Sequence, residues 1–229
     1  MNHTHESSLV KRVVNELVGS IVDGTYNGNL LPPQTELSKK HGVSRTVMRE
    51  ALSVLISRRM LDVRPKRGTQ ITPAKDWLII DPEIVEWRLR AAPDREFLDG
   101  LIELRKLVDP RAAWLAAIRA TEYERCVIDA AYHHLLDASS KGDAVQTAGE
   151  ILHMSILEAS ADQFILEMGA IIRAGFRAMA PDAYITNNAV DMVIDYYGKI
   201  VTAIDAHAGD EAKSLMTLLL TDIAEGIAR

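Results

Sequence analysis

Apolar residues recur at three- and four-residue intervals along most of the chain, which is the pattern of amphipathic helices. In the first quarter of the sequence, this pattern predicts helices over residues 8–23, 34–40 and 45–57. Gly and Pro residues separate these segments, as expected for turns. The third helix is expected to bury one face, formed by Val47 or Met48, Ala51, Leu52, Leu55 and Ile56.

Two short segments of alternating polar and apolar residues follow, at 61–64 and 69–72. The sequence Pro65-Lys66-Arg67-Gly68 joins them, which predicts a β-hairpin with a basic tip. Three helices followed by such a hairpin form a winged helix-turn-helix. The first domain is therefore expected to span residues 1–75.

From residue 95 onward, the pattern is helical almost throughout and shows no strand signal. It predicts six helices, over 98–120, 121–139, 143–160, 162–179, 189–207 and 209–228. Residues 76–94 are expected to be a linker with a short helix that begins at Pro82 and is capped by Asp81. The predicted fold is thus mainly α, with an N-terminal winged helix-turn-helix and a C-terminal all-α bundle over 95–229.

Charge divides the chain in the same place. Residues 1–75 hold 12 basic and 6 acidic side chains, a net +6, whereas residues 76–229 carry a net −12. A basic module on an acidic body suggests a polyanionic partner such as double-stranded DNA. The single cysteine, the polar N-terminus and the lack of a long apolar run predict a cytoplasmic protein with no membrane contact.

The residues expected to meet DNA lie at the start of the third helix and at the hairpin tip. Ser44 is the predicted N-cap, and Arg45, Thr46 and Arg49 fall on the polar face. A helix N-terminus favours phosphate, and Arg reads guanine O6 and N7 in the major groove. At the tip, Lys66, Arg67 and Gly68 can approach a phosphate or the minor groove closely. Paired domains of this kind predict a homodimer on a palindromic operator.

The segments VSRTVMREAL and PKRGTQITP make the first domain resemble the DNA-binding domain of the GntR family of bacterial regulators. One departure concerns Thr35, where many relatives contact the DNA backbone with Arg. That contact is expected to be absent or weaker here.

The segments LIELRKLVDPRAAWLAA and IVTAIDAHAGDEA resemble the first and last helices of the ligand-sensing (FCD) domain in the FadR branch of that family. The linker DWLIIDPEIVEWRL is most similar to branch members that repress sugar-acid catabolism. The resemblance implies an effector-binding and dimerisation domain. Many members bind zinc through one Asp and three His. In this chain those positions hold Gly149, His153, Tyr197 and Leu219, so no metal and no other cofactor is expected.

The same resemblance places Arg105 in the effector cavity, where a buried guanidinium calls for a carboxylate or phosphate. Asp109, one turn later, is its expected partner in the empty state, although the two also fit a plain i,i+4 helix pair. Arg173 and Arg177 form a second basic row, of which one residue is expected to face the cavity. His153 and Tyr197 would add hydrogen bonds to hydroxyl groups. Such a site suits a small hydroxylated acid.

The leading hypothesis is a transcriptional repressor that a small carboxylate effector releases from its operator. An activator, or an architectural DNA binder whose helical domain binds no ligand, remains an alternative. A metal-dependent enzyme is disfavoured because the sequence contains no HExxH, GxSxG, P-loop or GxGxxG motif.

Overall fold

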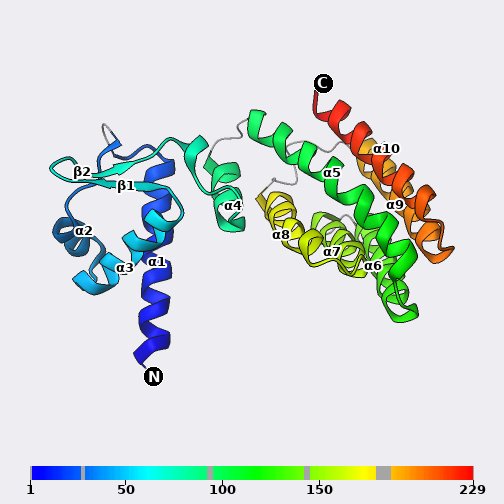
Figure 1. Ribbon diagram of the computed structural model, residues 1–229, viewed down its shortest axis with the longest axis horizontal. Helices are drawn as coiled ribbons and strands as arrows, with labels where there is room; N and C mark the ends of the chain where they lie inside the picture. Colours follow the sequence, from blue (N-terminus) through cyan, green and yellow to red (C-terminus); the bar gives the residue numbers. More distant parts are fainter. Residues whose placement is uncertain (1, 27–28, 92–94, 142–144, 179–186, 229) are drawn as a thin grey trace. The chain divides into compact units, whose positions relative to one another are not determined.

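The computed structural model describes residues 2–26, 29–91, 95–141, 145–178 and 187–228. The chain forms two compact units, Met1–Ala92 and Pro93–Arg229 (Figure 1). Within the described ranges, none of the helices combines the length and the apolar character that crossing a membrane requires.

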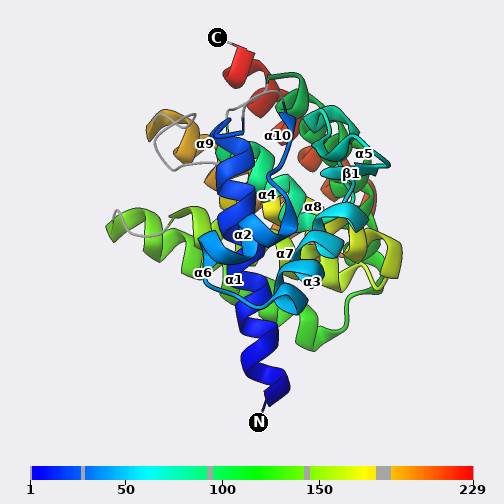
Figure 2. The same cartoon turned by 90° about the vertical axis from the view of Figure 1, so that its left-hand side faces the viewer.

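The first unit contains the predicted three helices and two-stranded wing, followed by a 3-10 turn and a fourth helix. Its elements are α1 (Asn2–Val22), α2 (Gln34–His41), α3 (Arg45–Ser57), β1 (Leu61–Arg64), β2 (Gly68–Ile71), the 3-10 turn η2 (Ala74–Asp76) and α4 (Pro82–Ala91). Helix α3 packs against α1 and α2 (Figure 2). Leu17, Leu37, Met48 and Leu55 come from all three helices and are fully buried, so the amphipathic faces read from the sequence form one core.

Three details of this unit differ from the prediction. Helix α1 begins at Asn2, six residues before the predicted start at residue 8, because the sequence MNHTHES lacks the apolar periodicity on which the prediction rested. Strand β2 begins at Gly68 rather than Thr69, because Gly68 pairs with Arg64 in the antiparallel register. Ile56, predicted to be buried, is 39% exposed, since the buried face of α3 ends at Leu55.

Arg58, which caps the end of α3, ties that helix to α4. Its guanidinium binds Asp81 Oδ2 at 2.7 Å, also pairs with Glu83, and lies 4.9 Å from the centre of the Trp87 ring. Asp81 in turn caps α4 as expected, because its Oδ1 accepts a hydrogen bond from the backbone N–H of Glu83 at 2.9 Å. The end of the third helix and the start of the linker helix therefore share one set of ion pairs.

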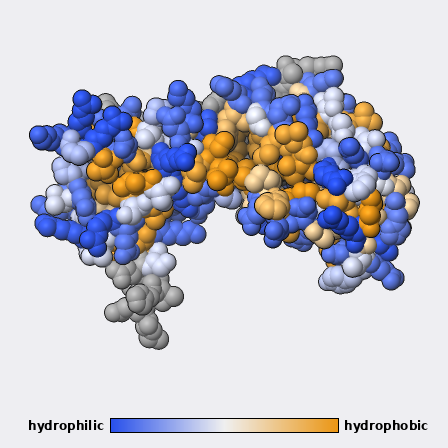
Figure 3. Space-filling view, in the orientation of Figure 1, coloured by the Kyte–Doolittle hydropathy of each residue, from blue (hydrophilic) through white to orange (hydrophobic). Residues whose placement is uncertain are grey.

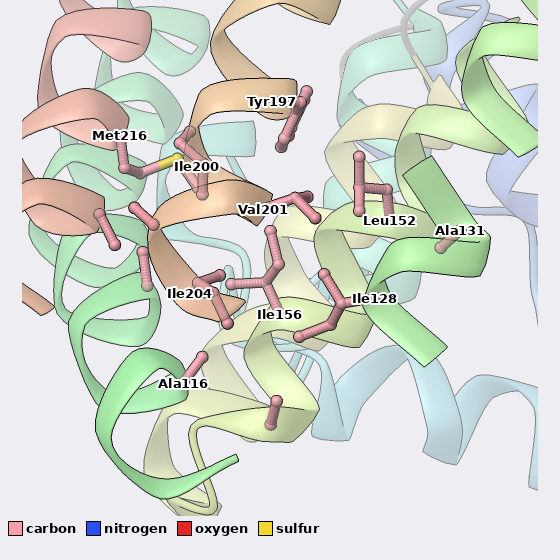
Figure 4. Packing of buried hydrophobic residues seen from close by; sticks show 14 of the residues in the cluster. Ala116, Ile128, Ala131, Leu152, Ile156, Tyr197, Ile200, Val201, Ile204 and Met216 are labelled. Atoms are coloured by element: carbon pink, nitrogen blue, oxygen red, sulfur yellow. The ribbon is translucent and has the colours of Figure 1, made fainter. Parts of the chain in front are cut away.

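The second unit is an all-α bundle, again as predicted. Its helices are α5 (Arg95–Arg119), α6 (Glu122–Lys141), α7 (Val145–Ala159), α8 (Gln163–Ala178), α9 (Asn187–Asp205) and α10 (Gly209–Ala228). Helix α5 packs against α7, α8, α9 and α10, and α6 packs against α7 and α9. Figure 4 shows the core between α6, α7, α9 and α10, where Ile128, Leu152, Ile156, Ile204 and Met216 are almost completely buried.

Small residues on α5 explain how so many helices can pack against it. Ala112, Ala113, Ala116 and Ala117 have no exposed surface, and such short side chains allow close approach of neighbouring backbones. Pro110 lies inside α5 and removes one backbone hydrogen bond, so tertiary packing must help to hold the helix together at this point. The residue before this proline is Asp109, which lies at the centre of the polar cluster described below.

Candidate functional site

The N-terminus of α3 is capped and presents polar side chains to solvent. Ser44 Oγ accepts a hydrogen bond from the backbone N–H of Val47 at 3.2 Å, which confirms the predicted cap. Arg45, Thr46 and Arg49 are exposed, whereas Val47 and Met48 between them are buried. The two arginines are one turn apart and lie beside the positive end of the helix dipole, an arrangement that suits an anionic partner.

Gln34 fixes this helix from outside, and the sequence analysis did not assign it such a role. Its side-chain Nε2 donates a hydrogen bond at 2.8 Å to the backbone carbonyl of Arg45. Because Gln34 is the first residue of α2, this bond joins the N-termini of α2 and α3. Sequence analysis noted a departure from the family pattern only at the neighbouring Thr35, and periodicity gives no signal for a polar contact of this kind.

The wing presents the three predicted basic-tip residues to solvent. The backbone N–H of Arg67 bonds to the carbonyl of Arg64 at 3.1 Å, which closes a turn with Pro65 and Lys66 at its centre. Lys66 has φ of 64° and Gly68 has φ of 79°, both in the left-handed region. Proline followed by a positive φ is typical of a type II turn. Lys66, Arg67 and Gly68 are all exposed.

In the second unit, a buried polar cluster joins α5 and α7. Asp109 Oδ2 lies 2.9 Å from Arg105 Nε and 3.0 Å from His153 Nε2. Asp109 has no exposed surface, His153 is 1% exposed, and the Arg105 side chain is 11% exposed. The Arg105–Asp109 pair is therefore an interior ion pair rather than a surface i,i+4 pair. The contact with His153, 44 positions along the chain from Asp109, was not predicted.

Charge and burial oppose each other at Asp109. Burial raises the pKa of its carboxyl, but the positive charges of His153 and Arg105, together with their hydrogen bonds, outweigh burial and hold that pKa below the usual 3.8. The carboxyl is consequently ionised at neutral pH. Figure 4 shows Tyr197 on α9 near Leu152 of α7, the residue that precedes His153 in the sequence.

Tyr197 brings a third helix to the cluster and is also buried. Burial raises the pKa of its phenol to about 12, while the charge of Arg105 and a hydrogen bond from Arg105 act in the opposite direction. The phenol therefore keeps its proton throughout the physiological range. Four of the five residues predicted to bind an effector, Arg105, Asp109, His153 and Tyr197, thus lie together.

The fifth predicted residue lies on a different helix. Arg173 is half-buried on α8, which packs against α5 and α7. Among the residues that the structure describes, Arg173 forms no ion pair, and no contact joins it to Asp109. The side chain of Arg177 lies outside the described residues.

The residues at the family's metal positions do not fit a divalent ion. Leu219 is fully buried in the apolar core and Gly149 has no side chain, so neither can be a ligand. The Tyr197 phenol stays protonated, and His153 contacts the Asp109 carboxylate. Across the described ranges, no group of three or more His, Cys, Asp or Glu side chains is placed to hold a metal.

The mismatch leads to a prediction about metal removal. We expect the purified full-length protein to contain substoichiometric zinc, and EDTA to leave its melting temperature unchanged, because the metal positions lack the required ligands. Elemental analysis and a thermal melt with and without EDTA test this. Stoichiometric metal that disappears in His153→Ala would contradict it.

The lowered pKa of Asp109 predicts a specific acid sensitivity. Because this carboxyl binds a proton less readily in the folded state, its contribution to stability is present above pH 3.8 and is lost as pH falls through the lower folded-state pKa. Asp109→Asn should therefore show a shallower loss of unfolding free energy below pH 4 than wild type, measured by urea denaturation. Asp137→Asn, an exposed carboxyl on α6, is the control and should follow wild type. Equal slopes for Asp109→Asn and wild type would show that Asp109 does not carry this sensitivity.

Comparison with known proteins follows the division into two units. Residues 9–71 match the family of bacterial regulatory proteins named gntR, and residues 100–222 match the FCD domain. The chain is similar to the galactonate operon transcriptional repressor of Escherichia coli, at 26% identity over 95% of both chains. It is also similar to the Glc operon transcriptional activator of the same organism, at 28% identity over 64% of this chain and 58% of that one.

A solved structure shares the fold. The Lar protein, which controls the agr system of Listeria monocytogenes, superposes with a TM-score of 0.66 at 14% identity, over 96% of both chains. The matched families and relatives are regulators of transcription rather than enzymes. The chain belongs to the GntR family of bacterial transcriptional regulators, with an FCD domain as its second unit.

Proposed function

We propose that this regulator is a repressor that binds a palindromic operator as a homodimer and is released by a small carboxylate effector. The observation that carries the proposal is the pairing of two sites in one chain. The first is the exposed Arg45–Arg49 face at the capped start of α3, and the second is the buried polar cluster of the FCD unit.

The first unit supplies the DNA-reading parts. Arg45 and Arg49 project from the first turns of α3, the part of a recognition helix that meets base edges in the major groove. Lys66 and Arg67 at the exposed wing tip are placed to contact phosphate. Gln34 and Ser44 hold the start of α3 in place, so we assign them to positioning rather than to reading.

The second unit supplies the effector site. A guanidinium group binds a carboxylate through two parallel hydrogen bonds. Within the cluster, Arg105 is the residue whose side chain always carries a positive charge. Asp109 and Tyr197 fix the position of Arg105 before any ligand arrives, which lowers the cost of ordering it on binding. The similarity to a repressor of a galactonate operon supports a sugar acid or a related metabolite as the effector.

An activator remains the second candidate because the chain is also similar to the activator of the Glc operon. Both modes use the same two sites. They differ in whether the effector weakens or strengthens operator binding. By linkage, operator DNA changes the affinity for the effector by the same factor. Titration of the protein with operator DNA, with and without effector, separates the two.

A homodimer is supported by an exposed apolar stripe on the FCD unit. Trp114 Nε1 on α5 donates to Asp210 Oδ1 on α10 at 3.1 Å, which fixes the level at which these helices meet. Leu107 lies seven residues before Trp114, and Leu218 lies eight residues after Asp210. Since α5 and α10 run in opposite directions (Figure 1), Leu107 and Leu218 lie at about the same height along this pair of helices.

The side chains of this stripe are poorly covered. Leu107 is 78% exposed, and Ile118 and Leu218 are each 51% exposed. Figure 3 shows hydrophobic areas on the face of the FCD unit that is in view, interrupted by hydrophilic ones. A second copy is the occupant that two symmetric DNA half-sites require, and an isologous contact places the same stripe on both sides.

Loss of the α3 arginines should weaken operator binding selectively. We expect Arg45→Ala or Arg49→Ala to cost about 1–3 kcal/mol on the operator and less on random DNA, because an arginine that reads guanine loses a base contact. Fluorescence anisotropy with an operator selected in vitro measures both. Arg95→Ala, an exposed arginine of the FCD unit, is the control. An equal loss on both DNAs would make the residue a phosphate contact instead.

Loss of Arg105 should uncouple the effector from DNA. We expect Arg105→Ala to lose about 2–5 kcal/mol of effector affinity, because a charge-assisted pair is removed from a buried site. Operator affinity without effector should stay near wild type, so the variant should repress permanently. Arg105→Lys should rescue poorly, since an ammonium does not replace a planar fork.

The measurement is operator titration with the sugar acid that gives the largest thermal shift on wild type. Lys106→Ala, the next residue on α5, is the matched control, and circular dichroism checks that each variant folds. Release of Arg105→Ala at the wild-type effector concentration would reduce Arg105 to a structural ion pair.

A charge in the apolar stripe should break the dimer. We expect Leu107→Asp to shift the mass measured by light scattering from dimer to monomer, because burying an unpaired carboxylate at an interface is costly. Phe164→Asp places the same charge on α8 at a side chain that is 75% exposed, and should leave the dimer intact. A dimeric Leu107→Asp would place the interface elsewhere.

A further inference from the structure

The C-terminal end of α3 is fastened to α4 by the side chain of one residue, Arg58. Its Nε donates a hydrogen bond to Asp81 Oδ2 at 2.7 Å, and its guanidinium also pairs with Glu83. The same group lies 4.9 Å from the centre of the Trp87 ring. Because Asp81 caps α4 and Glu83 and Trp87 are one turn apart on it, one guanidinium contacts the start of α4 in three ways.

The backbone of Arg58 joins the same two segments. Its N–H donates to the carbonyl of Val54 at 3.1 Å, and its own carbonyl accepts a hydrogen bond from the N–H of Leu78 at 3.0 Å. The side chains of Arg58 and Asp81 are 18% and 21% exposed, so solvent and salt screen this ion pair less than one on an open surface. Side chain and backbone together hold the end of α3 to residues 78–87.

Helix α4 also shares the apolar core of the first unit. Ile84 is fully buried in the same cluster as Met48 and Leu55 of α3. This places α4 inside the compact unit Met1–Ala92, although it follows the winged helix-turn-helix in the sequence. Helix α4 is therefore part of the body against which α3 is held.

The length of α3 turns a small change at its end into a large one at its start. Its 13 residues span about 20 Å, so a rotation of about 10° around the Arg58 end moves the opposite end by roughly 3 Å. A shift of about 3 Å is the full length of a hydrogen bond. Arg45 and Arg49 lie in the first turns of α3, so their reach toward base edges depends on what fixes the angle of this helix.

We propose that Arg58 is a positioning residue for DNA readout, and that through it α4 is a working part of the DNA-reading module. Arg58 sets the angle of α3, and thereby the reach of Arg45 and Arg49, without contacting DNA itself. This inference rests on the proposed function of those two arginines as base readers. An arginine suits this role because its planar group can bind two carboxylates and stack on an indole, which a lysine ammonium does not replace.

The sign of the charge effect separates positioning from direct contact with DNA. If Arg58 were a further cation on the phosphate backbone, its loss would weaken binding to every sequence, and neutralising Asp81 would strengthen it. If Arg58 positions α3, loss of either partner should weaken operator binding and leave random DNA nearly unaffected. Asp81→Asn is the suitable variant, because asparagine is also a good N-cap and preserves the start of α4.

The experiment measures fluorescence anisotropy of the full chain with an operator selected in vitro and with random DNA. We expect Arg58→Ala and Asp81→Asn each to lower the ratio of operator to random affinity by about tenfold, since contacts in one network are coupled. Arg58→Lys should restore only part of that ratio. Combining Arg58→Asp with Asp81→Arg should bind the operator better than Arg58→Asp alone, because an ion pair forms again.

Arg125→Ala is the matched control. The Arg125 side chain is 20% exposed, and its Nε lies 3.6 Å from Asp205 Oδ1, so it joins α6 to α9 of the FCD unit much as Arg58 joins α3 to α4. This variant removes a comparable contact between helices outside the DNA-reading unit. It should keep the full operator preference, whereas a loss equal to that of Arg58→Ala would contradict the positioning role.

Hydrogen exchange tests the same connection on the unaltered protein. Binding of operator DNA to wild type should slow exchange of the backbone amides of residues 82–91, because holding α3 also holds the helix fastened to its end. In Arg58→Ala this slowing should be lost. Unchanged exchange in α4 when wild type binds its operator would overturn the inference, even if the Arg58 variants failed to fold.

The outcomes separate this inference from the proposed function. If selection yields no preferred sequence, or if Arg45→Ala and Arg49→Ala lose affinity equally on both DNAs, base reading by α3 fails and the positioning role fails with it. If those variants lose the preference while Arg58→Ala and Asp81→Asn keep it, only the positioning role is wrong. An equal loss on both DNAs for Arg58→Ala, with a gain for Asp81→Asn, would make Arg58 a phosphate contact.

Discussion

The buried charge of Asp109 is the constraint around which the FCD unit is built. A carboxylate in an apolar interior is tolerated only when cations or donors surround it. Here Arg105 approaches from the same helix and His153 from α7, while Tyr197 of α9 lies against Arg105. Because Arg105 and His153 approach the same buried carboxylate from two helices, the relative placement of α5 and α7 is tied to Asp109.

Two residues of the cluster, His153 and Tyr197, stand at positions where the resemblance to the FadR branch implies metal ligands. A metal would bring positive charge to a set of oxygen and nitrogen ligands. In this chain Arg105 and His153 bring positive charge to Asp109, and the position of another ligand is filled by Leu219 of the apolar core. The proposed carboxylate effector would therefore meet the Arg105 guanidinium rather than a metal ion.

The DNA-reading unit depends on a different class of interaction, namely short polar contacts at helix ends. Ser44 and Gln34 fix the start of α3, and Arg58 fixes its end to the first turn of α4. The recognition helix is held at both ends by hydrogen bonds and ion pairs, while its middle is held by apolar packing. A shift of α4 would therefore act on α3 through Arg58, which gives the linker helix a direct mechanical connection to the reading helix.

Much of this could be read from the sequence, and what could not has a physical reason. Periodicity placed each of the six FCD helices within three residues of its observed bounds, because the apolar face of a helix is a local property. Ile56 was misplaced because it lies at the edge of the apolar face, where burial depends on what packs opposite. The contact between Asp109 and His153 joins α5 to α7, and no spacing rule tells which neighbour a polar residue on a buried face will meet. The Gln34 bond to Arg45 escaped prediction for the same reason.

The energetics of the cluster bear on whether the FCD unit binds a ligand at all. An ion pair in a protein interior adds little or nothing to stability compared with apolar side chains of similar size, since desolvation offsets the attraction. The surrounding core of α6, α7, α9 and α10 is apolar and well buried, so that core supplies cohesion of its own, separate from the Arg105, Asp109 and His153 contacts. Asp109 Oδ1, which accepts no hydrogen bond from the residues that the structure describes, adds a further cost. A helical domain that served only as a scaffold would gain from apolar residues at these positions, and the polar cluster therefore supports the proposed effector role of this unit.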